Sequence, residues 1–272
     1  SHVLICSGSM CVSRGAKTLR DEFEEHLSRL GIRDEIKLVN TGCVGLCEQG
    51  PFVIVYPEGV FYSTVKNRDI KTICEEHLYK GRIVEKLVFD EAIDEDHSVK
   101  AFDEIKFYAK QTRVAIRNCG LINPDDIEEY IAKDGYRGLG KALIEMTPIE
   151  VVEEMIASGL RGRGGGGFST GIKWRFAHNN ENDQKYIICN ADEGDPGAFM
   201  DRAVLEGDPH SVLEAMTIAG YAMGANTGLI YIRAEYPLAI HRLEVAIKQA
   251  TEYGFLGKDI FGSGFEYNIE IR

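Results

Sequence analysis

A short stretch dominated by glycine restricts what this chain can fold into more than any other part of its sequence. Six glycines lie between Gly162 and Gly171, and the four at positions 164–167 are consecutive. A loop this free of Cβ atoms can adopt positive φ angles and bring bare backbone N–H groups against a ligand. Such a loop suits the binding of a phosphate or a flat ring.

The side chains around the loop are of kinds that bind nucleotides. They supply positive charge and faces for ring stacking, from Arg161, Arg163 and Lys173 and from Phe168, Trp174 and Phe176. The stretch lacks the Gly-Lys-Ser/Thr end of a P-loop, and its spacing is not a clean Gly-x-Gly-x-x-Gly after a strand. A flexible linker is the alternative interpretation. Linkers, however, seldom mix basic and aromatic residues with their glycines.

Further motifs follow in order from about residue 116 to the C-terminus. They are Ser-Gly-Leu-Arg-Gly-Arg-Gly-Gly-Gly-Gly-Phe at 158–168, Thr-Gly-Ile-Lys-Trp at 170–174, Cys-Asn-Ala-Asp-Glu-Gly-Asp-Pro-Gly at 189–197, Asp-Pro-His at 208–210 and Tyr-Ile-Arg-Ala-Glu-Tyr at 231–236. Together they resemble the flavin- and NADH-binding subunit of respiratory complex I and its relatives in NAD-linked [FeFe] hydrogenases and NAD-dependent formate dehydrogenases.

Two close pairs of cysteines stand near the N-terminus, Cys6-x4-Cys11 and Cys43-x3-Cys47. Two pairs brought together by a fold are what four-thiolate ligation needs. Structural zinc and chance buried cysteines are the alternatives. Zinc sites favour two-residue gaps, whereas these loops carry small residues at 7–9 and 44–46 that let amides approach sulfur. The pattern favours a [2Fe–2S] cluster, and we expect Cys74, Cys119 and Cys189 to be core residues.

Residues 1–81 alternate strand and helix signals. We expect strands at 3–5, 35–39, 52–56 and 60–63, the last two joined as a hairpin through Pro57-Glu58-Gly59. We also expect a helix that ends before Gly31 and a last helix from Asn67. This βαβββα order and the cysteine spacing resemble the thioredoxin-like [2Fe–2S] ferredoxins at the N-terminus of hydrogenase-type flavoprotein subunits. A complex I flavoprotein subunit normally lacks this domain. The fusion therefore favours a hydrogenase or formate dehydrogenase type, in particular the beta subunit of NAD-dependent, electron-bifurcating [FeFe] hydrogenases.

Residues 82–140 are expected to be a linker and a helical segment. The part from 83 to 98 is acidic and poorly periodic, as an interdomain linker is. Asn123-Pro124 is typical of the start of a helix over 125–133. Thr147-Pro148-Ile149-Glu150 is a capping box for the helix that ends before Gly159.

Residues 141–272 are predicted to form the second domain, with strands at 185–189, 229–232 and 265–271 and helices at 208–223 and 237–253. Strands that alternate with helices indicate a mostly parallel sheet covered on both faces, with the strand at 185–189 buried. The predicted fold class is thus α/β throughout, a thioredoxin-like [2Fe–2S] domain followed by a Rossmann-like FMN-binding domain that is incomplete at its C-terminus.

Ligands of such sheets bind beyond the carboxyl ends of the strands. Asn-Ala-Asp-Glu at 190–193 lies there, where its side chains can accept from ribityl hydroxyls or flavin N–H groups; a solvated acidic turn is the alternative. By resemblance, FMN is contacted by Gly162, Arg163, Gly164, Lys173, Asn190, Asp192 and Glu193, and NADH by Gly165, Phe168, Phe176 and Asp195. The family often has Glu at position 195 and Ala at position 166. No catalytic acid or base is required.

The resemblance implies an NADH:acceptor oxidoreductase (diaphorase) subunit. Hydride exchange between NAD(H) and FMN would precede single-electron transfer through iron–sulfur clusters to a partner subunit of an [FeFe] hydrogenase. The other implied partners are a formate dehydrogenase catalytic subunit and a small ferredoxin-like subunit, and complex I is a further alternative. Two rivals of another class are a non-catalytic [2Fe–2S] electron-transfer or assembly module and a zinc-stabilised nucleotide-binding regulator.

Composition excludes some partners. The net charge of -12 over 272 residues argues against nucleic acid, which needs a basic face. Seven cysteines without an export signal indicate reduced thiols and a cytoplasmic protein. The uncharged run at 215–232 contains turn residues, so we expect no membrane span. The family's glycine- and glutamate-rich flavin loop, its [4Fe–4S] motif and its ubiquitin-like insert would follow Arg272. We therefore expect residues 1–272 alone to bind flavin weakly and to lack NADH oxidation.

Overall fold

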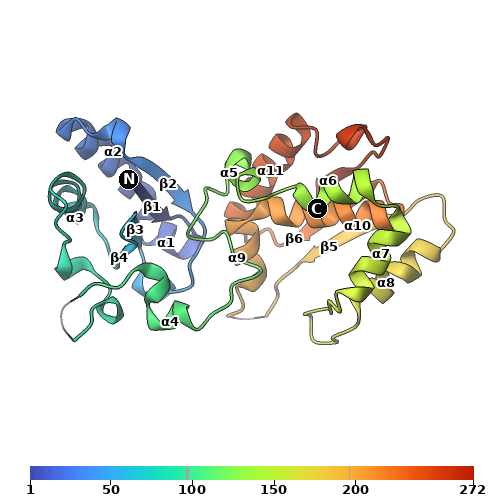
Figure 1. Cartoon of the computed structure of the whole chain (residues 1–272), viewed down its shortest axis with the longest axis horizontal. Helices are drawn as coiled ribbons and strands as arrows, with labels where there is room; N and C mark the ends of the chain where they lie inside the picture. Colours follow the sequence, from blue (N-terminus) through green and yellow to red (C-terminus); the bar gives the residue numbers. More distant parts are fainter. Residues whose placement is uncertain (96–97, 196) are drawn as a thin grey trace. The chain divides into compact units, whose positions relative to one another are not determined.

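The computed structural model describes residues 1–95, 98–195 and 197–272. The chain divides into two compact units, Ser1–Pro124 and Asp125–Arg272, and each has its own β-sheet (Figure 1). The predicted domain boundaries near residues 81 and 140 remain a prediction. Among the described residues, no helix combines the length and the apolar character that crossing a bilayer requires.

Unit 1 contains a four-stranded sheet and helices that are mostly short. The strands are β1 (His2–Cys6), β2 (Lys37–Thr41), β3 (Val53–Tyr56) and β4 (Val60–Tyr62), and the helices are α1 (Ser9–Ser13), α2 (Ala16–Leu30), α3 (Asn67–Thr72), which continues as a π-helix (Ile73–Tyr79), and α4 (Lys106–Ala109). The strand order is β2-β1-β3-β4, with β1 parallel to β2 and antiparallel to β3. The predicted strands, the hairpin and the Gly31 cap are confirmed.

One face of this sheet is covered by helices and the other by the segment after residue 83. The hydroxyl of Tyr62 lies 2.8 Å from Nδ1 of His77 in the π-helix, so the neighbouring Phe61 faces the opposite side. There the Phe61 ring packs against Phe89 and Phe102, at centroid distances of 5.7 and 5.5 Å. Apolar residues of the predicted linker, namely Val84, Val88, Phe89 and Ala92, are therefore core, because this second apolar face needs a cover. Its residues 96–97 lie outside the described residues.

Unit 2 has a three-stranded parallel sheet and seven α-helices among its described residues. The strands are β5 (Tyr186–Ala191), β6 (Thr227–Ile232) and β7 (Asn268–Ile271), and the helices are α5 (Ile127–Ile131), α6 (Arg137–Glu145), α7 (Pro148–Ala157), α8 (Thr170–Asn179), α9 (Met200–Gly207), α10 (Pro209–Met223) and α11 (Pro237–Glu252). The predicted parallel sheet and the helices from 209 and 237 are confirmed.

The prediction that this sheet is covered on both faces is wrong for the described chain. The side chains of Tyr186 and Ile188 on β5 are 55% and 65% exposed, and Tyr231 on β6 is 56% exposed. In the parallel register Asn190 pairs with Tyr231, so these residues share one face. The strand predicted as buried thus has one covered and one open side, since α10 packs on the opposite face, where Ile230 is fully buried.

Local capping signals explain where two of the helices begin. The capping box is confirmed at α7, where the backbone N–H of Thr147 donates to Glu150 at 2.7 Å. The predicted start at Asn123 is wrong, because Asp126 caps α5 by accepting the N–H of Glu128 at 2.9 Å. A side-chain oxygen that accepts one of the free amides stabilises the start of the helix at this residue.

Candidate functional site

The four predicted ligand cysteines meet at one end of the first sheet. Cys6 is the last residue of β1, Cys11 lies on α1, Cys43 follows β2, and Cys47 opens a 3₁₀ turn at Cys47–Gln49. The sulfur atoms of Cys43 and Cys47 are 3.3 Å apart, and the Cys6 thiol hydrogen bonds to Cys11 and Cys43. The fold therefore joins two pairs that are distant in the sequence.

Glycines let the cysteine loops approach each other closely. A Cβ on Gly50 would lie 2.6 Å from the Cys11 sulfur, and one on Gly8 would lie 3.0 Å from the Cβ of Cys43. The backbone N–H of Gly45 approaches the Cys43 sulfur at 3.4 Å. The predicted approach of an amide to sulfur is confirmed at Gly45, whereas Gly8 and Gly50 leave room for the cysteines themselves.

Crowding changes the acidity of these thiols. The hydrogen bond with Cys11 and burial raise the pKa of Cys6 to about 12, although Cys43 lowers it. The hydrogen bond with Cys47 lowers the pKa of Cys43, but the bond with Cys6 and burial outweigh it and raise the pKa to about 11. Four thiolates in one place repel one another, so a cationic centre is what would deprotonate them together.

These residues fit a two-iron cluster. Cys6 and Cys11 are buried, whereas Cys43 and Cys47 are half-buried. No group of three or more His, Cys, Asp or Glu among the described residues is arranged to hold a single metal ion. That finding does not bear on a [2Fe–2S] cluster, in which each iron takes two protein thiolates. The other cysteines in unit 1, Cys74 and Cys119, are fully buried as expected, whereas Cys189 is only half-buried.

The glycine-rich loop of unit 2 is closed at its base and open elsewhere. The N–H of Gly162 donates to the carbonyl of Phe168 at 2.8 Å, and the Arg161 guanidinium donates to the carbonyl of Gly167 at 3.0 Å. Between these contacts Gly165 and Gly167 have φ angles of 97° and 59°. A Cβ at any of positions 164–167 would meet nothing within 4 Å. The backbone here is exposed and fits a flat or phosphorylated ligand.

The loop leads directly into the N-terminus of α8. Ser169 caps this helix by accepting the N–H of Ile172 at 3.4 Å, and Gly171 is packed against Ile156 of α7. On α8 the side chains of Lys173 and Phe176 are exposed. The N–H of Thr170 donates to the carbonyl of Leu160 at 2.9 Å, so α8 favours an anion at this end through its dipole and its exposed lysine.

The four predicted residues at the end of β5 and in the turn after it differ in burial. Asn190, Asp192 and Asp195 are exposed, and the Asn190 side chain accepts the N–H of Asp192 at 3.1 Å. Glu193 is only 6% exposed. Its carboxylate accepts three backbone N–H groups at the start of α9, from Met200, Asp201 and Arg202 at 2.5, 3.1 and 3.2 Å. Glu193 thus stabilises the loop, and Pro196 within this motif lies outside the described residues.

A hollow of about 410 Å³ lies at the carboxyl ends of β5 and β6. Its described lining residues include Asp192 but none from the glycine-rich loop; the others are Gly194, Tyr231, Ile232, Arg233, Ala234, Glu235 and Arg272. The prediction that the two segments form walls of one pocket remains a prediction.

Sequence reasoning missed the role of Arg233. Its guanidinium donates to the carbonyl of Glu193 at 2.7 Å and lies 5.6 Å from the centre of the Tyr236 ring. Parallel pairing of β5 with β6 brings it there. Its place in the Tyr-Ile-Arg-Ala-Glu-Tyr motif was the only signal, and it did not indicate this contact.

Comparisons with known proteins match the N-terminal and C-terminal parts of the chain to two different families. Residues 1–78 match the family described as thioredoxin-like [2Fe–2S] ferredoxin, and residues 155–272 match the Nuo51 FMN-binding domain. The solved thioredoxin-like [2Fe–2S] ferredoxin from Aquifex aeolicus is 34% identical in the aligned region and covers 32% of this chain and 87% of its own, with a TM-score of 0.30.

Two curated relatives are named as hydrogenase subunits. The NADP-reducing hydrogenase subunit HndC of Solidesulfovibrio fructosivorans is 66% identical over 163 residues, which are 60% of this chain and 33% of that protein. The NAD-reducing hydrogenase HoxS subunit alpha of Cupriavidus necator is 31% identical over 276 residues, which span 100% of this chain and 43% of that protein. The chain thus spans less than half the length of either relative. The matches and the geometry together show that it combines a thioredoxin-like [2Fe–2S] ferredoxin domain with the FMN-binding domain of the Nuo51 family.

Proposed function

We propose that this chain belongs to an NADH:acceptor oxidoreductase, in which it exchanges a hydride between NAD(H) and FMN and passes single electrons through a [2Fe–2S] cluster to a partner subunit. The observation that carries the proposal is the presence of two different sites in one chain. One is a set of four gathered thiols, and the other is an open, bare-backboned loop before a helix N-terminus.

Cys6, Cys11, Cys43 and Cys47 would hold the [2Fe–2S] cluster. The support is their convergence on one end of the sheet and the absence of room for a Cβ at Gly50. Cys43 and Cys47 are the less buried pair, so an electron leaves the protein most directly on their side.

The glycine-rich loop and α8 would hold FMN. Gly164 offers a backbone N–H group, and Gly162 closes the base of the loop through its bond to the Phe168 carbonyl. Arg163 and Lys173 are exposed cations near the positive end of the α8 dipole, a combination that suits a phosphate. Asn190 and Asp192 present oxygens at the strand end. Glu193 would contribute through the loop that it anchors, because its carboxylate oxygens already accept three backbone amides.

The NADH side of the site would be formed by the exposed residues of the same loops. Phe168 and Phe176 are 55% and 64% exposed and offer ring faces for stacking. Gly165, with its positive φ, lets the backbone approach a ring closely, and Asp195 supplies a carboxylate. The bound flavin supplies the conversion of two-electron into one-electron chemistry, so the protein needs only to orient the rings.

The partner we propose is a hydrogenase catalytic subunit, together with a small ferredoxin-like subunit, and the compartment we propose is the cytoplasm. The support is that a relative named as a hydrogenase subunit aligns over both sites of this chain. Identification of the subunits that co-purify with the full-length protein tests this assignment. Co-purification with subunits of a formate dehydrogenase or of a quinone reductase would contradict the assignment to a hydrogenase.

The enzymatic proposal is tested on the full-length protein with Lys173→Ala and Asn190→Ala. We expect both variants to lose FMN, measured by flavin fluorescence after acid release, and to lose NADH:ferricyanide turnover in proportion. Lys248→Ala, which removes an exposed lysine of α11, is the matched control and should keep both. Unchanged FMN content in the first two variants would refute the site assignment. A protein that shows a reducible [2Fe–2S] EPR signal but no flavin would instead be an electron-transfer module.

A further inference from the structure

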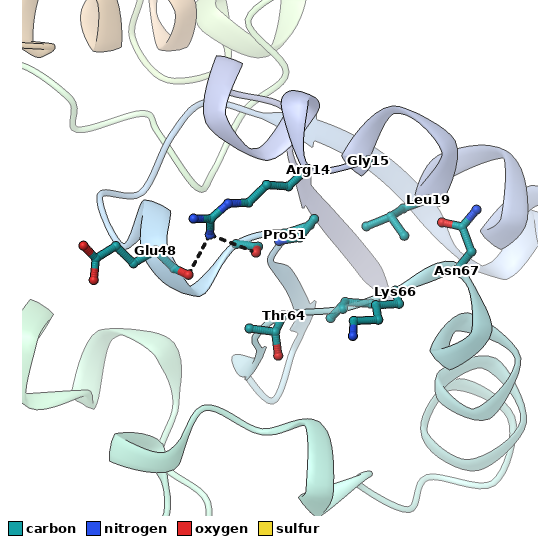
Figure 2. Close-up of a pocket in the computed structure, with 10 residues that line it drawn as sticks. Arg14, Gly15, Leu19, Glu48, Pro51, Thr64, Lys66 and Asn67 are labelled. Carbon is teal, nitrogen blue, oxygen red and sulfur yellow. Dashed lines mark hydrogen bonds between the residues drawn. The ribbon is translucent and has the colours of Figure 1, made fainter.

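Arg14 connects the two halves of the cysteine site. It is the residue that ends α1, the helix of Cys11, and its Nη1 group donates to the carbonyl oxygens of Cys47, Glu48 and Gly50 at 2.8, 2.6 and 3.5 Å. Figure 2 shows the guanidinium reaching this turn, with dashed lines to its carbonyls. One side chain of the first cysteine segment thus collects three carbonyls of the second.

These carbonyls belong to a short turn, in which the N–H of Gln49 donates to the carbonyl of Leu46 at 3.0 Å. The turn is a single 3₁₀ turn, within which the N–H of Gly50 donates to the carbonyl of Cys47 at 3.2 Å. A backbone contact from Thr64 to the carbonyl of Gln49 at 2.7 Å ties it to the rest of unit 1. Carbonyls that converge on one point repel one another unless a cation or donor lies between them.

The same turn is packed on Cys11 from another direction. A Cβ on Gly50 would lie 2.6 Å from the Cys11 sulfur, so the turn and that thiol are in direct contact. Movement of the turn would change both the position of the Cys47 sulfur and the packing of Cys11. Arg14 is three residues from Cys11 and bonds to Cys47 itself, so it fixes the distance between the two loops.

We infer that Arg14 is a positioning residue of the cluster site: it holds the Cys47 turn in the conformation that binds the [2Fe–2S] cluster. The inference rests on the proposed assignment of the four cysteines as ligands. An arginine suits the role because its planar fork presents several N–H donors in a fixed geometry, whereas a lysine presents one compact charge.

A second basic residue, Lys66, allows a positioning role of Arg14 to be distinguished from an effect of its charge alone. Arg14 and Lys66 both line a hollow of unit 1 beside the turn, with a volume of about 410 Å³ (Figure 2). Within the described chain, the Lys66 ammonium group makes no hydrogen bond to a carbonyl of residues 47–50. Lys66→Ala therefore removes a positive charge from the hollow that Arg14 also lines and leaves the bonds of Arg14 to the turn in place.

The test uses the full-length protein and the variants Arg14→Ala, Arg14→Lys and Lys66→Ala. The readouts are the rate of iron release to a chelator and the EPR spectrum of the reduced [2Fe–2S] cluster. Arg14→Ala should release iron roughly 10-fold faster or more, the effect expected when a partner of a ligand is lost. Its EPR spectrum should broaden, Arg14→Lys should show the same changes because charge alone is insufficient, and Lys66→Ala should match the wild type.

Wild-type release and an unchanged spectrum in Arg14→Ala would overturn the inference, and so would equal effects of Arg14→Ala and Lys66→Ala. If Arg14→Ala does not fold, Arg14→Lys decides the matter by the same readouts. Wild-type protein without iron would refute the proposed cluster ligands, which is a different result from an insensitive Arg14 variant.

Discussion

The two candidate sites are built in opposite ways. In unit 1 the thiols are crowded, and a single added carbon at Gly50 would collide with the Cys11 sulfur. In unit 2 a carbon added at Gly164 or Gly166 would meet nothing within 4 Å. The cysteine site is shaped by protein atoms before any ligand arrives, whereas the glycine-rich loop presents an open surface.

This difference follows from what each site would bind. A metal cluster is held by a few short bonds, so its ligands must be fixed to within a fraction of an ångström by surrounding packing. A nucleotide that must enter, react and leave needs an accessible backbone and ring faces instead. Other residues therefore stabilise unit 2. The ring of buried His210 lies 2.9 Å from the Tyr136 hydroxyl and 3.2 Å from the side-chain oxygen of Gln249, and Glu193 anchors the start of α9.

The largest expected effect tests the crowded site itself. Cys43→Ala in the full-length protein removes a proposed ligand, so we expect complete loss of the [2Fe–2S] EPR signal and of the iron that this cluster contributes, with FMN retained. Cys189→Ala, a half-buried thiol of β5, is the control and should keep its iron. Equal iron content in the two variants would show that the gathered thiols are not the ligands.

The pH dependence of the unfolding free energy tests how far buried His210 stabilises unit 2. Burial lowers the pKa of His210 from 6.5 to about 4, although Gln249 and Asp126 oppose the shift. The folded pKa lies below the unfolded one, so the stabilising effect of neutral His210 is present above pH 6.5 and is lost as the pH falls towards 4. The loss should approach about 3 kcal/mol of unfolding free energy.

Fluorescence of Trp174, the single tryptophan of the chain, follows unfolding of unit 2 in urea and measures this loss. His210→Gln has no proton to gain, so its stability relative to the wild type should rise as the pH falls through this range. The exposed His241 of α11 supplies the control variant, His241→Gln, which should follow the wild type. Parallel curves for wild type and His210→Gln would contradict the prediction.

Paired glycine substitutions test the contrast between the sites directly. Gly50→Ala should destabilise unit 1 by roughly 1–3 kcal/mol, the usual cost of overpacking, whether or not a ligand is bound. Gly164→Ala should change stability by less than about 0.5 kcal/mol, as exposed substitutions do, but should lower the FMN content of the full-length protein. Hydrogen exchange resolved by unit measures both stabilities, and Gly166→Ala serves as a neutral control, because the family often has alanine there. The comparison fails if Gly50→Ala is as mild as Gly164→Ala.

The smallest effect concerns the anchor of the strand-end loop. Glu193→Gln keeps the shape of the side chain but removes the charge that faces three N–H groups of α9, and should cost about 1 kcal/mol of unit 2 stability. Asp195→Asn, at an exposed position of the same loop, should cost less than about 0.5 kcal/mol. Trp174 fluorescence again reports the change, and equal effects would show that Glu193 is not an anchor.

Much of this architecture was predictable from local signals. The hairpin at Pro57-Glu58-Gly59, the Gly31 cap and the Thr147 capping box depend on residues adjacent in sequence, and each was predicted correctly. The segment after residue 83 was misjudged, because its apolar residues are spaced without period. Phe89 and Phe102 are core residues only because the sheet offers an apolar face around Phe61.

The sequence alone determined the chemistry that the chain can offer, namely two cysteine pairs, a glycine-rich loop with cations and aromatic rings, and the alternation of strands and helices. Those properties are carried by residue types and by spacings of a few residues. Only the tertiary structure decided that Cys6 meets Cys43, that Arg14 bonds to the Cys47 turn, that Glu193 is buried as a helix anchor, and that one face of β5 is open. Each of these features depends on strand pairing or packing between segments that are distant in the sequence. The residues next to a segment in the sequence do not indicate which distant segment it will pair with.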